Sequence, residues 1–289
     1  MNSQRPFKQR FSFEFFPPKT PAGMEKLQTV RDELAKRDPD FFSVTYGAGG
    51  STQERTINTV VNLHKQGIST APHLSCIGAT TETLTELLDL YKANDIQRIV
   101  ALRGDLPSGM GAHGELRYAN DLVEFIRKHS GDHFNIEVAA YPEFHPQAAN
   151  AEQDLINFKR KVDAGANSAI TQYFYNIDSY FYFVDRAETM GIDIPIVPGI
   201  MPITNYSNLI RFSDMCGAEV PRWIRKQLEA YGDDIDSIKK FGEEVVTEMC
   251  ERLLDEGAPG LHFYTLNQVE PSLNIWDNLS LSDQEKIAF

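Results

Sequence analysis

The sequence predicts a single α/β domain folded as a (β/α)8 barrel, also called a TIM barrel. Apolar, β-rich segments alternate about eight times with segments of helical periodicity over 289 residues, a typical length for this fold. The segments 41–45 and 98–102 are apolar almost throughout, as expected of parallel strands covered on both faces. A doubly wound open sheet is the alternative that this alternation leaves open.

The expected elements follow one another in a regular order. Strands are expected at residues 12–15, 41–45, 70–74, 98–102, 135–140, 168–172, 194–199 and 261–265. Helices are expected at residues 25–37, 53–65, 80–94, 119–128, 151–164, 179–190 and 237–256. Thr80 can cap the third helix and Gly165 follows the fifth, as is typical of helix boundaries.

Two further expectations concern the organisation of the chain. The stretch from Pro221 to Gly260 is longer than one barrel unit needs, so an extra helix is expected before the last strand. No linker-like segment divides the chain. Residues 1–289 are therefore expected to form one domain, with residues 1–10 as a flexible N-terminal arm.

Composition and charge narrow the class of protein. The formal net charge of −13 gives no indication of nucleic-acid or membrane binding, although an acidic surface still permits a local basic pocket. Cys76, Cys216 and Cys250 show no ligand spacing and are expected to be reduced thiols. No apolar run approaches the roughly 18 residues of a membrane span, and no signal peptide is recognised. The expected location is the cytoplasm.

Polar side chains gather at the carboxyl ends of the expected strands, where barrel enzymes build their sites. These residues are Glu14, Thr45, Tyr46, His73, Arg103, Gly104, Asp105, Tyr141, His145, Gln172, Pro198, Gly199, Met201 and Tyr264. His73 and His145, each taken alone, could be hydrogen-bonded loop residues, and Tyr141 could be an ordinary rim aromatic. Their recurrence at nearly every strand end predicts an active site.

Several kinds of chemistry lack their sequence signatures. There is no GxSxG elbow and no CxxC, so nucleophilic catalysis finds no support. There is no HExxH or similar cluster, so no metal site is expected. No strand is followed by GxGxxG, so a dinucleotide would have to bind without a Rossmann unit.

Nine segments in order closely resemble bacterial methylenetetrahydrofolate reductase, and together they span nearly the whole chain. They are FEFFPPK (13–19), FSVTYGAGGST (42–52), APHL (71–74), ALRGDLP (101–107), AAYPEFHP (139–146), KRKVDAGA (159–166), ITQYF (170–174), PGIMPITN (198–205) and HFYTLN (262–267). The resemblance implies the catalytic barrel alone, without the C-terminal regulatory domain of the eukaryotic enzymes.

The resemblance implies a noncovalent FAD and the reduction of 5,10-methylenetetrahydrofolate to 5-methyltetrahydrofolate, which supplies methyl groups for methionine synthesis. The reductant is NADH or NADPH, and bacterial relatives favour NADH. It also implies a ping-pong cycle in which nicotinamide and folate stack in turn on the same flavin face, and a homo-oligomer. This arrangement accounts for the missing Rossmann motif, because the nicotinamide needs no domain of its own.

Site residues are carried over position by position. Those that resemble the family's cofactor contacts are Thr45, Tyr46, Ala48, His73, Arg103, Gly104, Asp105, Ala119, Tyr141, His145, Ala148, Asp154, Asn157, Arg160 and Lys161. Those that resemble its substrate contacts are Glu14, Thr45, Gln172, Asn208, Phe212, Tyr264 and Gln268. Arg103, Arg160 and Lys161 can neutralise a diphosphate, and Asp154 can accept hydrogen bonds from sugar hydroxyls.

Two positions depart from the resemblance. Gln268 stands where Arg is expected, and Asn208 stands where Gln is expected. Both positions touch the substrate in the family, so the departures concern affinity for the folate tail rather than the chemistry.

Glu14 is the expected general acid. If Glu14 points toward the barrel mouth, Phe13 and Phe15 point into the helix layer, because side chains alternate along a strand. The substrate carries a methylene carbon between N5 and N10, and a proton on N10 opens this ring to an N5 iminium cation. A carboxyl group in a water-poor pocket keeps its proton more readily, because desolvation disfavours the anion. A structural carboxylate at a strand end is the alternative.

Asp105 is the second expected catalytic residue. Its fixed negative charge near the flavin would destabilise anionic reduced flavin and favour the iminium cation.

Two other functions remain as alternatives. One is another flavin barrel oxidoreductase, of the proline dehydrogenase type. The other is a cofactor-free pterin-binding barrel that transfers or carries methyl groups.

Overall fold

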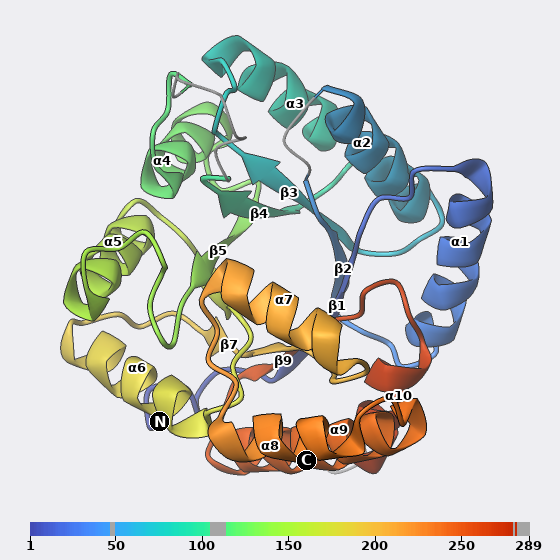
Figure 1. The fold of residues 1–289 in the computed structure, drawn as a ribbon. Coiled ribbons are helices and arrows are strands. Elements are labelled where there is room, and N and C mark those ends of the chain that lie inside the picture. The colour runs from blue at the N-terminus through green and yellow to red at the C-terminus, as the bar shows by residue number, and fades with distance from the viewer. Residues whose placement is uncertain (47–49, 105–113, 280, 282–289) are drawn as a thin grey trace, which may run out of the picture.

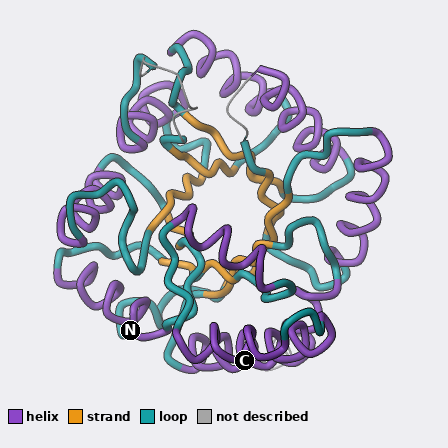
Figure 2. The backbone as a smooth tube through the Cα atoms, viewed as in Figure 1, coloured by secondary structure: helices purple, strands orange, loops and turns teal. Residues whose placement is uncertain are grey.

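Parallel strands form a ring at the centre of the computed structural model, and helices surround it (Figures 1 and 2). The structure describes residues 1–46, 50–104, 114–279 and 281. The strands are β1 (Arg10–Phe15), β2 (Phe41–Val44), β3 (Thr70–Ser75), β4 (Arg98–Leu102), β5 (Asn135–Ala140), β6 (Ser168–Thr171), β7 (Ile196–Val197), β8 (Gly199–Ile200) and β9 (Gly260–Tyr264). The helices are α1 (Pro21–Ala35), α2 (Gly50–Lys65), α3 (Thr81–Ala93), α4 (Ala119–Ser130), α5 (Ala151–Asp163), α6 (Ile177–Thr189), α7 (Tyr206–Cys216), α8 (Arg222–Tyr231), α9 (Ile235–Asp255) and α10 (Glu270–Asn278).

The ring closes through one interrupted strand. Neighbouring strands follow the order β7-β6-β5-β4-β3-β2-β1-β9-β8, and every pair is parallel. β7 pairs with β6 and β8 pairs with β9, and only Pro198 separates β7 from β8. Proline has no N–H to donate to a ladder, so the single strand expected at 194–199 is divided there. The predicted barrel is confirmed, and the open sheet is wrong.

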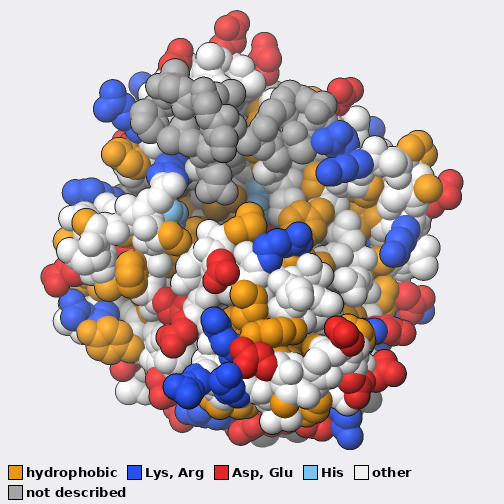
Figure 3. Space-filling model, viewed as in Figure 1, with side chains coloured by type: hydrophobic (Ala, Val, Ile, Leu, Met, Phe, Trp, Pro, Cys, Tyr) orange, Lys and Arg blue, Asp and Glu red, His pale blue; other side chains and the backbone are white. Residues whose placement is uncertain are grey.

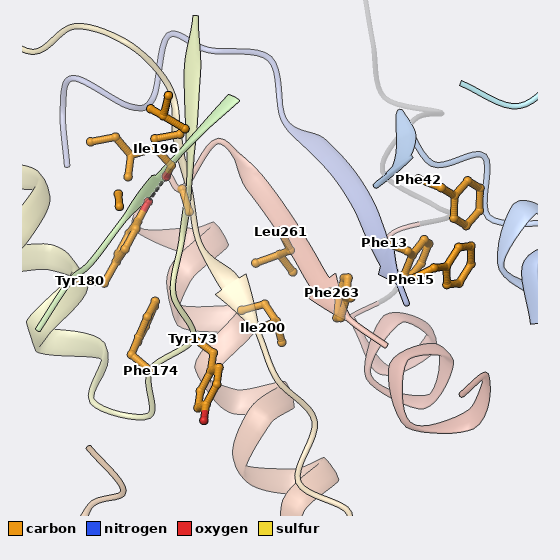
Figure 4. Close-up of a cluster of buried hydrophobic side chains, with 14 of the residues drawn as sticks. Phe13, Phe15, Phe42, Tyr173, Phe174, Tyr180, Ile196, Ile200, Leu261 and Phe263 are labelled. Carbon is orange, nitrogen blue, oxygen red and sulfur yellow. Dashed lines mark hydrogen bonds between the residues drawn. The ribbon is translucent and has the colours of Figure 1, made fainter. Parts of the chain in front are cut away.

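Side chains along β1 point alternately toward the helices and into the barrel. Phe13 and Phe15 point outward to the helix layer, where both stack on Phe42 (Figure 4). Phe13 also packs on Phe263 and on Trp276 of α10. Ser12 and Glu14 lie on the opposite face of the same strand and point into the barrel. The expected direction of Glu14 is therefore confirmed.

The interior of the barrel combines an apolar layer with buried polar groups. Phe41, Ala71, Val100 and Ile170 form a small cluster inside the ring, separate from the large core between sheet and helices. At the end where the strands begin, Arg98 is paired with Glu137, which also accepts a hydrogen bond from Ser168. Because a buried charge is tolerated only when it is paired, Arg98 and Ser168 allow the Glu137 carboxylate to lie in the floor of the barrel.

Several local signals are confirmed. The Thr80 side chain accepts a hydrogen bond from the backbone of Thr83 and caps α3. Gly165, with φ of 113°, follows the end of α5. The stretch between Pro221 and Gly260 holds α8 and α9, so the extra helix is also present.

Helix α7 lies across the end of the barrel where the strands finish (Figures 1 and 2). Its C-terminal part contacts the loop after β5, because a Cβ at Gly217 would meet Pro146 at 2.7 Å. The Tyr173 hydroxyl, just beyond β6, lies 3.1 Å from Ser213 Oγ of the same helix. α7 therefore forms a partial cover over the barrel mouth.

The first residues, where a flexible arm at residues 1–10 is expected, pack against the rest of the domain. Gln4 is fully buried, donates from its amide to Ile194 O at 3.2 Å and accepts from the Ile196 backbone at 2.8 Å. The Met1 ammonium lies 3.0 Å from an Asp185 carboxylate oxygen. The polar and charged residues of this segment do not indicate such packing, because Gln4, the side chain that anchors it, is itself polar.

None of the helices in the described part of the chain combines the length and the apolar character that crossing a membrane requires.

Candidate active site

A buried carboxylate between two imidazoles lies at the centre of the barrel mouth. Glu14 Oε2, at the end of β1, is 3.3 Å from His73 Nε2 on β3 and 3.6 Å from His262 Nε2 on β9. Glu14 and His73 are each 8% exposed and His262 is 0% exposed. Ser12 Oγ lies 2.7 Å from His262 Nδ1. These four residues are called the Glu14 cluster below.

The pKa of Glu14 is shifted by two opposing influences. Burial alone would raise its pKa, but His73 and His262 outweigh burial and lower the pKa of Glu14 to about 2. This direction is opposite to that expected of a carboxyl group that keeps its proton more readily in a water-poor pocket. Desolvation acts as expected, but two imidazoles that face the same oxygen atom stabilise the anion more strongly.

Tyr264 forms the wall of the mouth beside this cluster. Its ring meets the His262 ring edge-on, with centroids 5.4 Å apart. Its hydroxyl donates to Thr171 O at 2.7 Å. Burial, and next the Glu14 charge, raise the pKa of Tyr264 well above its usual value, so the phenol stays neutral. Nearby, the Thr265 hydroxyl donates to Glu14 O at 2.6 Å and fixes the backbone of the carboxylate.

A cleft lies beside the mouth, between the ends of β4 and β5, and is called the β4–β5 cleft below. It is lined by Ala101, Leu102, Arg103, Gly104, Ala119, Ala139, Tyr141, His145 and Lys161. Six of these residues were expected to contact the cofactor. Figure 3 looks onto this end of the molecule and shows a hollow beside α7, with histidine side chains in view at its edge.

Two cations line the β4–β5 cleft. Lys161 donates to Ala139 O at 2.5 Å, and burial lowers its pKa to about 8 even though the Asp154 carboxylate acts in the opposite direction. Arg103 donates to Gly104 O at 3.1 Å and to Gln147 Oε1 at 2.6 Å. All three acceptors are neutral oxygens, so none of them neutralises either cation. The cleft is therefore suited to an anionic group such as a diphosphate.

Gly104 permits the close packing of this cleft. Its φ is +87°, and a Cβ there would overlap Ser75 Oγ and lie 2.8 Å from Ile77 Cγ2. Ser75 Oγ in turn donates to Arg103 O at 2.7 Å. Only glycine fits both the backbone conformation and the space.

The other residues expected at the cofactor lie in neighbouring segments. Thr45 and Tyr46 follow β2, and the Thr45 carbonyl accepts from Thr56 at 2.8 Å. Ala148 donates its backbone N–H to His145 O at 2.8 Å. Ala48 and Asp105 lie outside the described residues.

On α5, the polar side chains already have partners within the protein. Asp154 Oδ2 accepts from the His145 backbone at 2.9 Å, so this oxygen shapes the loop after β5. Asn157 Oδ1 accepts from Arg160 at 3.0 Å, and Arg160 is exposed. The His145 ring packs edge-on against Tyr141, with centroids 4.7 Å apart.

The residues expected at the substrate are divided between the mouth and its surroundings. Gln172 lies at the end of β6, in a narrow cleft that Tyr173 and Cys216 also line. On α7, Phe212 is half-buried beneath the Arg211 guanidinium, and the exposed Asn208 accepts from Arg211 at 3.3 Å. Gln268 is exposed and lines a separate cleft with residues of α9 and α10. Glu14 and Tyr264 lie together beside the buried imidazole of His262.

Sequence reasoning missed His262, Ser12 and Thr171. A signal for the first two was present, because His262 lies two residues before Tyr264 and Ser12 lies two residues before Glu14. On a strand this spacing puts both pairs on one face. The role of Thr171 depends on its backbone carbonyl, which no residue type reveals.

Comparison with known proteins identifies the family. The sequence model of methylenetetrahydrofolate reductase matches residues 2–280. The chain belongs to the methylenetetrahydrofolate reductase family. Among relatives, 5,10-methylenetetrahydrofolate reductase of Escherichia coli is 43% identical over 271 residues, which cover 93% of this chain and 90% of that protein.

Further similarities are to a plant protein and to a solved bacterial structure. Methylenetetrahydrofolate reductase (NADH) 1 of Arabidopsis thaliana is 40% identical, over 96% of this chain and 49% of the plant protein. A solved structure of a Clostridium thermocellum protein, described as binding two copies of 5-methyl-5,6,7,8-tetrahydrofolic acid, aligns with a TM-score of 0.66 and 18% identity. It covers 97% of this chain and 95% of that one, and at this identity it shows the fold alone.

Proposed function

We propose that this protein reduces 5,10-methylenetetrahydrofolate to 5-methyltetrahydrofolate with electrons from NADH, passed through a bound FAD in a ping-pong cycle. The observation that carries the proposal is a buried Glu14 carboxylate between two imidazoles at the barrel mouth of a chain from this family. We also propose, on the resemblance alone, a cytoplasmic homo-oligomer that serves methionine synthesis.

The β4–β5 cleft supports FAD as the cofactor. Arg103 and Lys161 direct positive charge into it, and Gly104 leaves space where any other residue would introduce a Cβ. We propose that these residues hold the diphosphate, while Tyr141 and His145 line the adjoining wall. Bound FAD would take two electrons from NADH and return them to the methylene carbon of the folate.

Glu14 supplies the acid in this proposal. The substrate would cover the remaining exposed part of Glu14, and the added desolvation would increase the carboxylate's affinity for a proton. The proton then passes from Glu14 to N10, the bond from N10 to the methylene carbon breaks, and an iminium cation remains at N5. The carboxylate left on Glu14 stabilises this cation electrostatically.

The remaining contacts are proposed to orient the pterin and the tail. Gln172, with an amide that can donate and accept, would hold the pterin edge. Phe212, Asn208, Thr45, Tyr264 and Gln268 would contact the rest of the folate. The exposed positions of Asn208 and Gln268 fit a role in tail recognition.

The decisive experiment separates the two half-reactions. Under anaerobic conditions, NADH should bleach the yellow protein, and methylenetetrahydrofolate should restore its colour. The Glu14→Gln variant should bind flavin and be bleached normally, but it should reoxidise about 10²–10⁴-fold more slowly, because general acid catalysis typically contributes this much.

The exposed Glu82 on α3 offers a matched control. Glu82→Gln removes the same charge from a side chain that belongs neither to the Glu14 cluster nor to the lining of the β4–β5 cleft, and it should leave both half-reactions unchanged. A colourless protein, or normal reoxidation of Glu14→Gln, would overturn the assignment. Repeating the first half-reaction with NADPH measures which nicotinamide is preferred.

A further inference from the structure

The two imidazoles beside Glu14 occupy different environments. His73 lies on β3 at the rim and is slightly exposed, whereas His262 is completely buried beneath the carboxylate. His262 also has a second partner, because its Nδ1 lies 2.7 Å from Ser12 Oγ. The proposed function gives no step to Ser12 or His262, yet His262 faces Glu14 from inside the barrel and Ser12 contacts His262.

We propose that His262 is a positioning residue that, oriented by Ser12, holds Glu14 as a carboxylate and sets how readily it takes up the proton destined for the substrate. This inference rests on the proposed function only for the identity of the proton acceptor. The chain Ser12–His262–Glu14 itself is a feature of the ligand-free protein.

The position of the ring proton on His262 determines whether its Nε2 can donate to Glu14. When the imidazole is neutral and Ser12 donates to Nδ1, the ring proton is on Nε2 and faces Glu14. When the imidazole is charged, both nitrogens carry protons and Ser12 accepts. The remaining tautomer would put an unprotonated Nε2 opposite a carboxylate oxygen at 3.6 Å, which would leave two facing acceptors in a buried site. The Glu14 carboxylate therefore favours a proton on Nε2, and Ser12 supplies the partner that Nδ1 then needs.

The surroundings of His262 contain little else that carries charge. The Phe41 ring of β2 stacks on it at 6.1 Å, and Tyr264 of β9 meets it edge-on as a neutral phenol. On the β8 side its register partner is Gly199, which has no side chain. Arg98 lies over the same Phe41 ring, but Glu137 neutralises it.

Glu14 is thus the charged group that His262 faces at close range, and His73 approaches the same oxygen from β3. Removing His262 takes away a buried donor, while desolvation of Glu14 continues to favour its neutral form. The carboxyl group should then bind a proton at a higher pH. An ordinary packing residue at position 262 would have no such effect.

The test is an infrared titration of the ligand-free protein, with the band of protonated Glu14 assigned by its absence in Glu14→Gln. His262→Phe keeps an aromatic ring against Phe41 and Tyr264 but lacks both nitrogens. We expect this variant to protonate Glu14 at a pH at least about one unit higher than the wild type, a tenfold change in proton affinity. Ser12→Ala should produce a smaller shift in the same direction.

His262→Gln is the matched variant, because its amide donates near the position of Nε2 but does not titrate. It should shift the Glu14 titration less than His262→Phe. If His262→Phe does not fold, Ser12→Ala and His262→Gln decide the question. An unshifted Glu14 band in the folded variants would overturn the inference.

A kinetic measurement connects the Ser12–His262–Glu14 chain to the reaction. In His262→Phe the pH at which the folate half-reaction declines should move upward with the Glu14 titration, whereas reduction by NADH should keep its pH profile. An equal loss of both half-reactions at every pH would indicate a structural role and would contradict the inference. If the wild type reduces no folate although its Glu14 titration responds to His262, the proposed function fails and the inference stands.

Discussion

Tyr264 reaches Thr171 across the strand that lies between them. Its hydroxyl donates to Thr171 O at 2.7 Å, and the intervening strand contributes Gly199, whose N–H donates to Thr171 Oγ1 at 2.9 Å. A Cβ on Gly199 would overlap Thr171 O and lie 2.6 Å from Tyr264 Cε2. The interrupted seventh barrel strand is thus completed by side-chain hydrogen bonds, at the place where Tyr264 meets the mouth.

We expect Gly199→Ala to destabilise the protein by about 1–3 kcal/mol, because an added methyl group must displace Tyr264 or the backbone of β6. Tyr264→Phe should cost a similar amount, about 1–3 kcal/mol, since Thr171 O loses its buried donor. The double variant should lose clearly less than the sum, because each change already breaks the same contact. Urea denaturation of all four proteins measures this coupling, and strict additivity would contradict it.

Gly104→Ala should weaken flavin binding by at least about tenfold, or about 1.4 kcal/mol. The added Cβ overlaps Ser75 Oγ, which holds the Arg103 carbonyl at the edge of the β4–β5 cleft. Gly67→Ala is the matched control, because Gly67 has a similar φ of +82° and no atom within 4 Å of the place that a Cβ would take. Both variants incur backbone strain, but only Gly104→Ala should release flavin during dialysis. Equal flavin retention would argue against the cleft as the cofactor site.

Flavin affinity should decrease as the pH rises through about 8, the value to which burial lowers the pKa of Lys161. Below that pH Lys161 is an ammonium that attracts a diphosphate, and above it the amine is neutral. Binding an anion favours the protonated form, so binding should take up a proton in this range. Fluorescence titrations of the apoprotein with FAD between about pH 7 and 9.5, which bracket that pKa, measure the slope.

Lys161→Met should flatten this dependence and lower the affinity at pH 7. Lys159→Met on the same helix serves as the control, because Lys159 is paired with Asp163 at 2.7 Å and does not line the cleft. A slope that persists unchanged in Lys161→Met would assign the titration to another group.

Asp105→Asn should spare or accelerate reduction by NADH and slow the folate half-reaction. The physical reason is electrostatic, since a fixed negative charge opposes further negative charge on its neighbours and favours a cationic substrate. Rapid-mixing measurements of each half-reaction provide the comparison. Slowing of both steps by the same factor would indicate that Asp105 acts through binding or folding instead.

The sequence predicts the barrel because its strands carry apolar residues on both faces and its helices have recognisable ends. β4 and β5 are predicted with both boundaries correct, because β4 ends before the polar Arg103 and β5 begins at the polar Asn135 and ends before Tyr141 and Pro142. α7 is not predicted, because it is short and lies over the mouth rather than against the outer face of the sheet. β7 and β8 are separated at Pro198. This break is recognised only when the pairing of β7 with β6 and of β8 with β9 is known.

Glu14 shows where sequence reasoning reaches its limit in the site. Strand alternation places its side chain in the mouth, and that expectation is confirmed. Its charge state is determined by His73 and His262, which closure of the barrel brings to the same oxygen atom from β3 and β9. Desolvation can be anticipated from an apolar strand, but the balance between desolvation and two imidazoles requires their distances.

The position of α7 has a consequence for how new specificities can be engineered. The residues of the Glu14 cluster extend from the rigid strands β1, β3 and β9, whereas Asn208 and Phe212 are carried by a helix that crosses the opening from outside. In the proposed function, proton delivery and ligand selection would therefore depend on different parts of the scaffold. Randomising the solvent-facing positions of residues 206–216 therefore offers a route to altered pterin analogues or tail lengths while leaving the acid and its two imidazoles in place.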